Sequence, residues 1–509
     1  MRDQRLHRQP KNALFLLGVA ALLLSAAGCA PSAEETGTDT ATVAEIPVTT
    51  SSDAARELFD EGQQLLDVGR GVEAREKFQA ALAEDPEFVR AYYGESNAAL
   101  SFQEFQRSLD AAMAHLEAVS DGERMLVEIN RTFLTNDSEE GVRLAEELVS
   151  QYPESARAEI ALAFQRTRLN DNQGARAAFE RAHELAPNLP GALYGVAGNY
   201  LFGEPKDFAK AEEWAAKAIA ATPGEAKGHE LMGDIKRAQG DLEAALAAYE
   251  AATAADPSMP NGHHKSGHIN SFLGNIEEAR AAYDAGVATA RPENKAGLAV
   301  YKTFTRIHQG DVPAALDELE TLAGEMAAMG TPADQLKGLQ VFAHNSQAVA
   351  AMHAGLLDRA AAAVAKGNEL RMAIAADVGT ADAERLQKAG CHQWDGLLAA
   401  YGGDAEAAAE HAEAIGALVE GDDNPRKMEG AHYVLGMSAL KAGDFAAAVE
   451  HLRQADHANN IFVRYQLALA EEGAGNDEVA KELFAQVGSF NFNSIGFALA
   501  GRDAKARAG

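Results

Sequence analysis

A cluster of histidines, His263–His268, has a spacing that suits metal binding. His264 and His268 lie four residues apart, so on a helix their imidazoles share one face and could chelate a transition metal. A third ligand could come from Glu230 or Asp234, about one repeat earlier in the sequence. A neighbouring lysine opposes a bound cation, and the imidazoles could equally be hydrogen-bonding groups of a binding surface. We therefore expect no metal, and a ligand- or metal-binding protein that uses this cluster is the alternative interpretation.

Cys391 and His392 are adjacent, a pairing that could suggest an activated thiol. Neighbouring side chains on a helix point about 100° apart, so this histidine is badly placed to act as the base of the cysteine. We interpret Cys391 as a small, partly buried side chain. The sequence contains no Walker A loop, no HExxH motif, no EF-hand loop and no nucleophile elbow. We expect no catalytic residues, no cofactor and a protein that is not an enzyme.

Composition favours an all-α fold. Of the 509 residues 47% are hydrophobic, only 15 are prolines, and aromatics make up 6%, while good helix formers dominate long stretches. The formal net charge is −31, which repels nucleic-acid phosphates, so we expect no nucleic-acid partner. Only two cysteines are present, and one lies in the N-terminal segment described next. Helix packing, rather than disulfides, must therefore hold the protein together.

The N-terminal sequence is typical of a targeting signal. Four basic residues precede an apolar run over 13–24, which is too short to span a bilayer, and Leu24-Ser25-Ala26-Ala27-Gly28-Cys29 follows. This arrangement resembles a bacterial lipoprotein signal peptide. The resemblance implies that residues 1–28 are removed, that Cys29 is lipidated with acyl chains such as palmitate, and that the protein is anchored in the cell envelope, at the outer membrane facing the periplasm. An ordinary cleaved signal peptide is the alternative. Residues 29–53 are rich in Thr, Ser and acids without apolar periodicity and predict a disordered tether.

From residue 54 onwards a spaced frame of small, aromatic and turn residues recurs. One copy runs Gly233, Gly240, Ala245, Tyr249 and Pro257, and closing prolines at 153, 187, 223 and 257 are 34, 36 and 34 residues apart. This frame resembles the tetratricopeptide (TPR) repeat. The resemblance implies an all-α, right-handed superhelical solenoid of about eleven helix pairs.

Each recurring residue type has a physical role in such pairs. Glycines such as Gly62 let two helices approach closely, and large residues such as Phe78 fill the space between neighbouring pairs. Gly-Asp steps such as Gly240-Asp241 end one helix in a left-handed turn and cap the next. Proline closes the pair because its ring cannot continue the helical hydrogen bonds.

The frame predicts the order of segments. We place an N-terminal TPR array at 54–330, a TPR-like array at 331–488, and a C-terminal cap and tail at 489–509. Residues 101–152 are irregular and predict a degenerate unit, although Ser120 and Glu123 form a capping-box pattern. Longer helices are expected around 323–340 and 371–388. The apolar tail over 490–499 either caps the last repeat or docks to a partner.

Binding is expected on the concave surface that TPR proteins build from the first helix of each pair. In the family's frame this surface would carry Arg56, Phe59, Gln63, Arg90, Tyr93, Asn97, Arg157, Phe164, Arg168, Tyr194, Phe202, Lys227, Glu230, Asp234, Arg237, Asn261, His264, His268 and Phe272. Aromatic, arginine and amide side chains suit an extended peptide. The Lys and Asn of the clamp that grips chaperone C-termini are replaced by Phe59 and Gln63. We expect a membrane-anchored scaffold whose partners are proteins or peptides, with an oligomeric state that the sequence leaves open.

Overall fold

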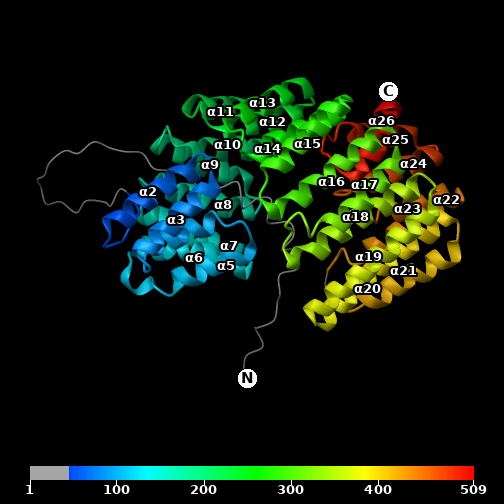
Figure 1. Ribbon diagram of the computed structural model, residues 1–509, viewed down its shortest axis with the longest axis horizontal. Coiled ribbons are helices and arrows are strands. Elements are labelled where there is room, and N and C mark those ends of the chain that lie inside the picture. The colour runs from blue at the N-terminus through cyan, green and yellow to red at the C-terminus, as the bar shows by residue number, and fades with distance from the viewer. Residues whose placement is uncertain (1–44, 423) are drawn as a thin grey trace, which may run out of the picture. The chain divides into compact units, whose positions relative to one another are not determined.

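The computed structural model describes residues 45–422 and 424–509, and most of this part of the chain is helical. It holds 25 α-helices and one short 3-10 helix, η1 (Leu116–Ala118), with no strand among the described residues (Figure 1). In chain order the described helices form twelve consecutive pairs followed by a single C-terminal helix, and the two helices pack together in eleven of these pairs. The predicted fold class, an all-α array of helix pairs, is confirmed.

The chain divides into two compact units, with the boundary between Ile235 and Lys236, inside α12. The pairs of unit 1 are α2 (Asp53–Asp67) with α3 (Gly71–Glu84), α4 (Val89–Asn97) with α5 (Phe102–Met113), α6 (Asp121–Thr135) with α7 (Ser138–Gln151), α8 (Ala156–Arg168) with α9 (Asn172–Leu185), and α10 (Pro190–Phe202) with α11 (Phe208–Ala221).

The sixth pair, α12 (Ala226–Gln239) with α13 (Leu242–Ala255), contains the boundary. Unit 2 continues with α14 (Pro260–Leu273) and α15 (Ile276–Thr289), α16 (Pro292–Gln309) and α17 (Val312–Glu325), α18 (Ala333–His353) and α19 (Leu357–Val378), α20 (Ala381–Gly402) and α21 (Ala405–Val419), α22 (Glu429–Ala442) and α23 (Phe445–Leu452), α24 (Ile461–Gly473) and α25 (Asp477–Gly488), and finally α26 (Ile495–Ala508).

Four features bear on the predicted organisation. The boundary between the compact units falls within α12, whereas the sequence predicts a division of the arrays near residue 330. The irregular stretch 101–152 contains a complete pair, α6 with α7, so the described chain has twelve pairs rather than eleven. The predicted capping box of Ser120 and Glu123 begins α6. The extended helices are α18, α19 and α20, of 21, 22 and 22 residues.

Phe78 shows why glycine and aromatic residues recur together. Its ring is fully buried, and a Cβ added at Gly62 would lie 2.9 Å from it, and one added at Gly94 2.6 Å from it. Gly62 is on the first helix of the same pair and Gly94 on the first helix of the next pair, so one ring fills the space between two pairs. Phe179 packs in the same way against Gly195 of the following pair. Close packing of this kind leaves no room for a methyl group.

The turns within pairs follow the predicted chemistry. Gly240, Gly310 and Gly443 adopt positive φ angles of 83°, 87° and 79°. The aspartate that follows Gly240 accepts a hydrogen bond from the backbone N–H of Ala244 at 3.1 Å and so caps α13. Because glycine reaches the left-handed region without a Cβ clash, this step ends one helix and starts the next within two residues.

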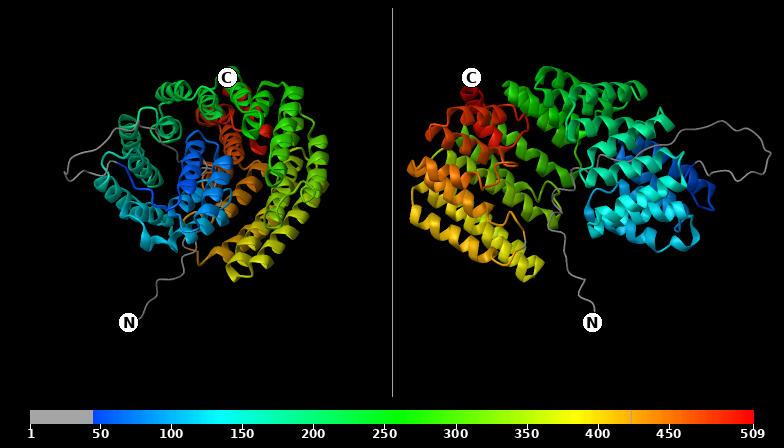
Figure 2. Two further views of the ribbon diagram at one scale, coloured as in Figure 1. Left: turned by 60° about the vertical axis from the view of Figure 1, so that its left-hand side comes forward. Right: turned by 180° about the vertical axis from the view of Figure 1, so that it is seen from behind.

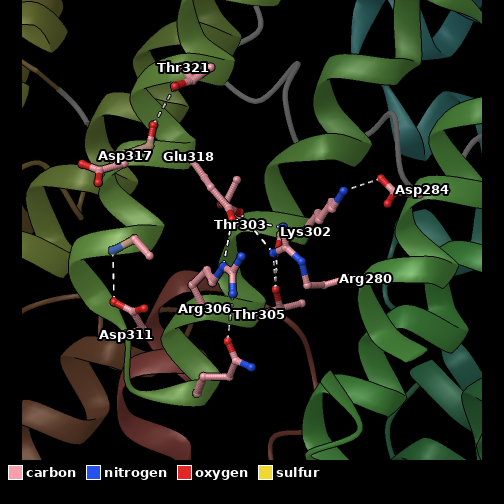
Figure 3. Close-up of polar contacts among 12 residues, drawn as sticks. Arg280, Asp284, Lys302, Thr303, Thr305, Arg306, Asp311, Asp317, Glu318 and Thr321 are labelled. Carbon is pink, nitrogen blue, oxygen red and sulfur yellow. Dashed lines mark hydrogen bonds and ion pairs between the residues drawn. The ribbon is translucent and has the colours of Figure 1, made fainter. Parts of the chain in front are cut away.

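In unit 2, charged side chains connect neighbouring pairs (Figure 3). Glu318 of α17 accepts hydrogen bonds from Arg306 of α16 at 2.8 Å and from Arg280 of α15 at 3.0 and 3.1 Å. Arg280 also donates to the Thr305 hydroxyl at 2.9 Å. One carboxylate therefore joins three successive helices, with both arginines and the glutamate partly shielded from water.

The C-terminal helix does more than cover the last pair. Besides α24 and α25, helix α26 packs on α16 and α18, and in Figures 1 and 2 the red helix lies beside green helices. The Phe497 ring lies 5.1 Å from the ring of Phe272 on α14. The segment 489–508 thus links the end of unit 2 to its earlier pairs. Within the described residues, no helix combines the length and the apolar character required to cross a bilayer.

Candidate functional site

The histidine cluster forms a partly buried aromatic group rather than a ligand set. The rings of His264 and His268 lie 4.3 Å apart, both pack against Tyr301, and Nδ1 of His268 is 2.7 Å from the Tyr283 hydroxyl. Burial lowers the pKa of His264 to about 4 and that of His268 well below its ordinary value, so both are neutral at pH 7. In the described part of the chain, no three His, Cys, Asp or Glu side chains are grouped so that they could hold a metal ion.

We define the inner face of a unit as the face formed by the first helices of its consecutive pairs. In unit 2 this face holds a segment of the chain itself, residues 490–493. Arg237 of α12 donates to the backbone carbonyl of Asn491 at 3.0 Å, and its guanidinium lies 3.7 Å from the centre of the Phe492 ring. Asn493 donates to the Tyr283 hydroxyl at 2.8 Å, and its amide oxygen lies 3.4 Å from Nε2 of His308 on α16. First helices of three successive pairs therefore take part, with α15 supplying the tyrosine.

The tail accordingly reaches residues expected on a binding surface. Arg237, His268 and Phe272 contact it, and so does His308, to which the sequence assigned no role. The tail is thus more than a cap on the last pair, because α12, α14 and α16 lie far from α25 in the sequence.

In unit 1 the inner face also holds an extended segment. We call residues 45–52 the strap; they precede α2, and Ile46 is 5% exposed. Arg90 of α4 donates to the carbonyl of Pro47 at 3.1 Å, and Arg56 of α2 donates to the carbonyl of the next residue. Glu123 of α6 accepts the backbone N–H of Thr49 at 2.7 Å and its hydroxyl at 2.7 Å.

The strap is also held at each end. Ser155, which precedes α8, donates to the carboxylate of Glu45 at 2.9 Å, and the hydroxyl of Thr50 donates to Asp85 at 2.5 Å. Side chains on or next to the first helices of four consecutive pairs therefore bind one extended peptide. Residues 45–52 belong to the disordered tether that the sequence predicts for 29–53; they are ordered here, and residues 29–44, with Cys29, lie outside the described chain.

Several predicted surface residues of unit 1 lie in the helix core instead. Phe59 is 2% exposed, with ring centres 5.7 Å from Phe78 and 5.2 Å from Phe88. Gln63 is buried and donates to Asp67 at 3.3 Å. A residue's position in the repeat frame does not by itself show whether its side chain faces a ligand or packs between helices.

A second group packs either within its own pair or against the next one. The Phe164 ring lies 5.1 Å from that of Phe179. Tyr93 is 6% exposed, and Asn97 accepts a hydrogen bond from Asn130 at 2.8 Å.

The remaining predicted residues lie towards the end of unit 1. Arg168 lies over the Phe133 ring at 4.0 Å, and burial lowers its pKa to about 10. The Tyr194 hydroxyl lies 3.1 Å from that of Thr222. Phe202 is exposed, at 52%.

Lys227 pairs with Glu230 at 3.4 Å, and Asp234 is half-buried. Among the predicted residues, Phe202 is the large apolar side chain most exposed to solvent, and it is the last residue of the first helix α10.

The sequence missed three strap-binding residues, of which Asp85 is the C-cap residue of α3. The sequence identifies Glu123 only as the capping-box glutamate of α6. Its second role, accepting a hydrogen bond from the strap, depends on a segment more than seventy positions away. Ser155 gave no signal.

The lone described cysteine is not an activated thiol. The Cys391 Sγ lies 3.9 Å from the carbonyl of Asn368, and burial raises the pKa of the thiol. A raised pKa keeps the thiol protonated, which makes it a poor nucleophile.

Comparison with known families agrees with these helix pairs. Residues 59–123 match the family model described as tetratricopeptide repeat, and residues 233–271 match a second model described as TPR repeat. Residues 59–123 and 233–271 therefore carry tetratricopeptide repeats. The two matches cover pairs in both compact units, and the TPR frame continues between and beyond them in the packing of Phe179 on Gly195 and in the turn at Gly443. No curated protein matches the chain.

Solved structures with similar helix pairs include MamA from Desulfovibrio magneticus RS-1, with 20% identity over 33% of this chain and 94% of that one and a TM-score of 0.28. PilW, described as a widely conserved type IV pilus biogenesis factor, has 17% identity over 41% of this chain and 96% of that one, with a TM-score of 0.34. A TPR protein from Parabacteroides merdae ATCC 43184 has 14% identity over 57% of this chain and 98% of that one, with a TM-score of 0.32. At such identities the similarity concerns the repeat fold alone.

Proposed function

We propose that this TPR protein is a membrane-anchored scaffold of the cell envelope that binds extended segments of other proteins on its inner faces. Stacked repeats provide long, continuous surfaces that serve binding rather than catalysis. The proposal is strengthened by the chemistry of partly buried groups that a reaction might use, because burial keeps the Cys391 thiol protonated and His264 and His268 neutral.

One observation carries the proposal. Each unit already holds an extended segment of this chain on its inner face, and arginines bind the main-chain carbonyls of that segment in both. Contacts to carbonyl and N–H groups do not depend on the side chains of the bound peptide, so faces that hold a chain in this way can bind other extended segments.

The anchoring part of the proposal depends on the N-terminal sequence. The lipobox-like stretch ending at Cys29 supports attachment by acyl chains, and two or more such chains anchor a protein stably. The segment between Cys29 and the strap would place the repeats near the membrane surface, where envelope proteins could be recruited.

Site-specific photo-crosslinking in cells tests the scaffold function. A photoreactive phenylalanine analogue replaces Phe202, the exposed aromatic residue on the first helix α10, and the matched control replaces Lys217, which is partly exposed on the second helix α11. The expected result is a discrete protein adduct from position 202 and none from position 217. Equal labelling from both positions, or no protein adduct from position 202, would contradict binding on the inner face.

A further inference from the structure

The strap of unit 1 is bound in the manner of a ligand. Three successive strap residues form hydrogen bonds through their main chain: Pro47 with Arg90, Val48 with Arg56 and Thr49 with Glu123. Ile46 inserts into the core cluster that also contains residues of α4 and α6. One buried side chain, with hydrogen bonds to backbone groups on either side, is the pattern of a linear peptide held in a groove.

The inner face of unit 1 is charged where it meets the strap. Arg90 is 3% exposed and Glu123 is fully buried, and the guanidinium meets the main chain at Pro47 while the carboxylate meets it at Thr49. The Arg90 pKa falls to about 10 because of burial, so the group remains cationic at pH 7. Buried charges require hydrogen-bonding partners, and an extended peptide supplies a carbonyl for the one and an N–H for the other.

Another extended chain could make most of the contacts that the strap makes. Ile46 is its only fully buried apolar side chain among residues 45–52, and most of the remaining contacts use carbonyl, amide or hydroxyl groups. A segment with an aliphatic residue, a proline, a second aliphatic residue and a threonine would satisfy the same groups. Such a segment would compete with the strap for the same site.

We propose that the strap is an exchangeable self-ligand, and that unit 1 binds partner segments of the pattern aliphatic–proline–aliphatic–threonine in its place. This inference rests on the proposed scaffold function and names its ligand chemistry. Binding of a partner segment frees residues 45–52, which releases up to about 28 Å of chain ahead of α2, at roughly 3.5 Å per extended residue. Binding of a partner is thereby coupled to the distance that the repeats can extend from the membrane.

The test uses the purified full chain and a fluorescent peptide with the strap sequence EIPVTTSS. The variant Ile46→Ala removes the strap's buried side chain and leaves all receiving residues intact. We expect the labelled peptide to bind this variant at least tenfold more tightly than the unmodified protein. A peptide with the same residues in scrambled order should bind at least tenfold more weakly to the variant.

A change in the peptide provides a check that does not depend on how a variant folds. N-methylation at the residue equivalent to Thr49 removes the N–H that Glu123 accepts, and we expect at least a tenfold loss of affinity. Equal affinity for the variant and the unmodified protein, no binding to either, or indifference to scrambling or N-methylation would overturn the proposal. Crosslinking from position 202 would still report a partner in those cases, so failure of the inference and failure of the scaffold function are distinguishable.

Discussion

Replacing Gly195 with alanine tests the packing that makes the helix pairs stack. A methyl group at this position would lie 2.8 Å from Cζ of Phe179 and closer still to two other atoms of the ring. The ring is 2% exposed and packs edge-on at 5.1 Å against Phe164 on the first helix of its own pair, so it cannot turn aside without disturbing that contact. Glycine to alanine inside a helix alone stabilises by about 1 kcal/mol, whereas overpacking costs about 1–3 kcal/mol.

A matched control lies on the same helix. A methyl group added at Gly198 would have no neighbouring atom within 4 Å, so Gly198→Ala should gain helix propensity without a clash. We expect Gly195→Ala to lower the free energy of unfolding of unit 1 by up to about 2 kcal/mol and Gly198→Ala to raise it by up to about 1 kcal/mol. A Phe179→Leu background should reduce the cost of Gly195→Ala, because the smaller side chain makes room for the methyl group.

Urea unfolding followed by tryptophan fluorescence measures this difference. The chain has two tryptophans, Trp214 on α11 next to the substituted helix and Trp394 in unit 2, so a Trp394→Phe background makes the signal local to unit 1. A local probe is needed because repeat arrays do not always unfold in one step. If Gly195→Ala proved as stable as Gly198→Ala, the argument from helix nesting would be refuted.

Three further results are expected. Glu318→Gln should lower the stability of unit 2 by about 1–2 kcal/mol, seen as a lower urea midpoint, because a partly exposed carboxylate that pairs with two arginines loses its charge; an unchanged midpoint would show that the network in Figure 3 contributes nothing. His264 and His308 have pKa values lowered to about 4 by burial, so below their ordinary value of 6.5 the unfolded chain binds more protons than the folded one. The urea midpoint of unit 2 should therefore be highest above about pH 6.5 and fall towards about pH 4, and a midpoint that rises on acidification would contradict their burial. Cys29→Ser should move the protein from the membrane fraction to the soluble fraction, and persistent membrane association in high salt would exclude a lipid anchor.

The repeat architecture could be predicted because its determinants are local. The spacing of Gly62 and Phe78 fixes how two helices nest, and the structure places that ring against glycines of two successive pairs, as predicted. Pro187 and Pro223 each follow the end of a second helix by two residues, since proline cannot continue the hydrogen-bond ladder. Such signals repeat every 34 to 36 residues, so one weak indication is confirmed by the next.

The occupied inner faces could not be predicted, because they depend on contacts far apart in the sequence. The strap has no apolar periodicity, and its order comes from Arg90 and Glu123, which lie 43 and 74 residues from their bound partners. The tail contacts are more distant still, with Arg237 and Asn491 separated by 254 residues. Nor does the repeat frame distinguish Phe59, which packs in the core, from residues that meet a bound segment.

The most direct test of the account is hydrogen exchange at the Thr49 amide in the purified full chain. If the inner face of unit 1 binds an extended segment, this N–H, donated to Glu123 at 2.7 Å, should exchange at least tenfold more slowly than in the isolated peptide, and Arg90→Ala should remove much of that protection. Exchange at the rate of an unstructured peptide would contradict the central claim that these TPR faces hold extended chains.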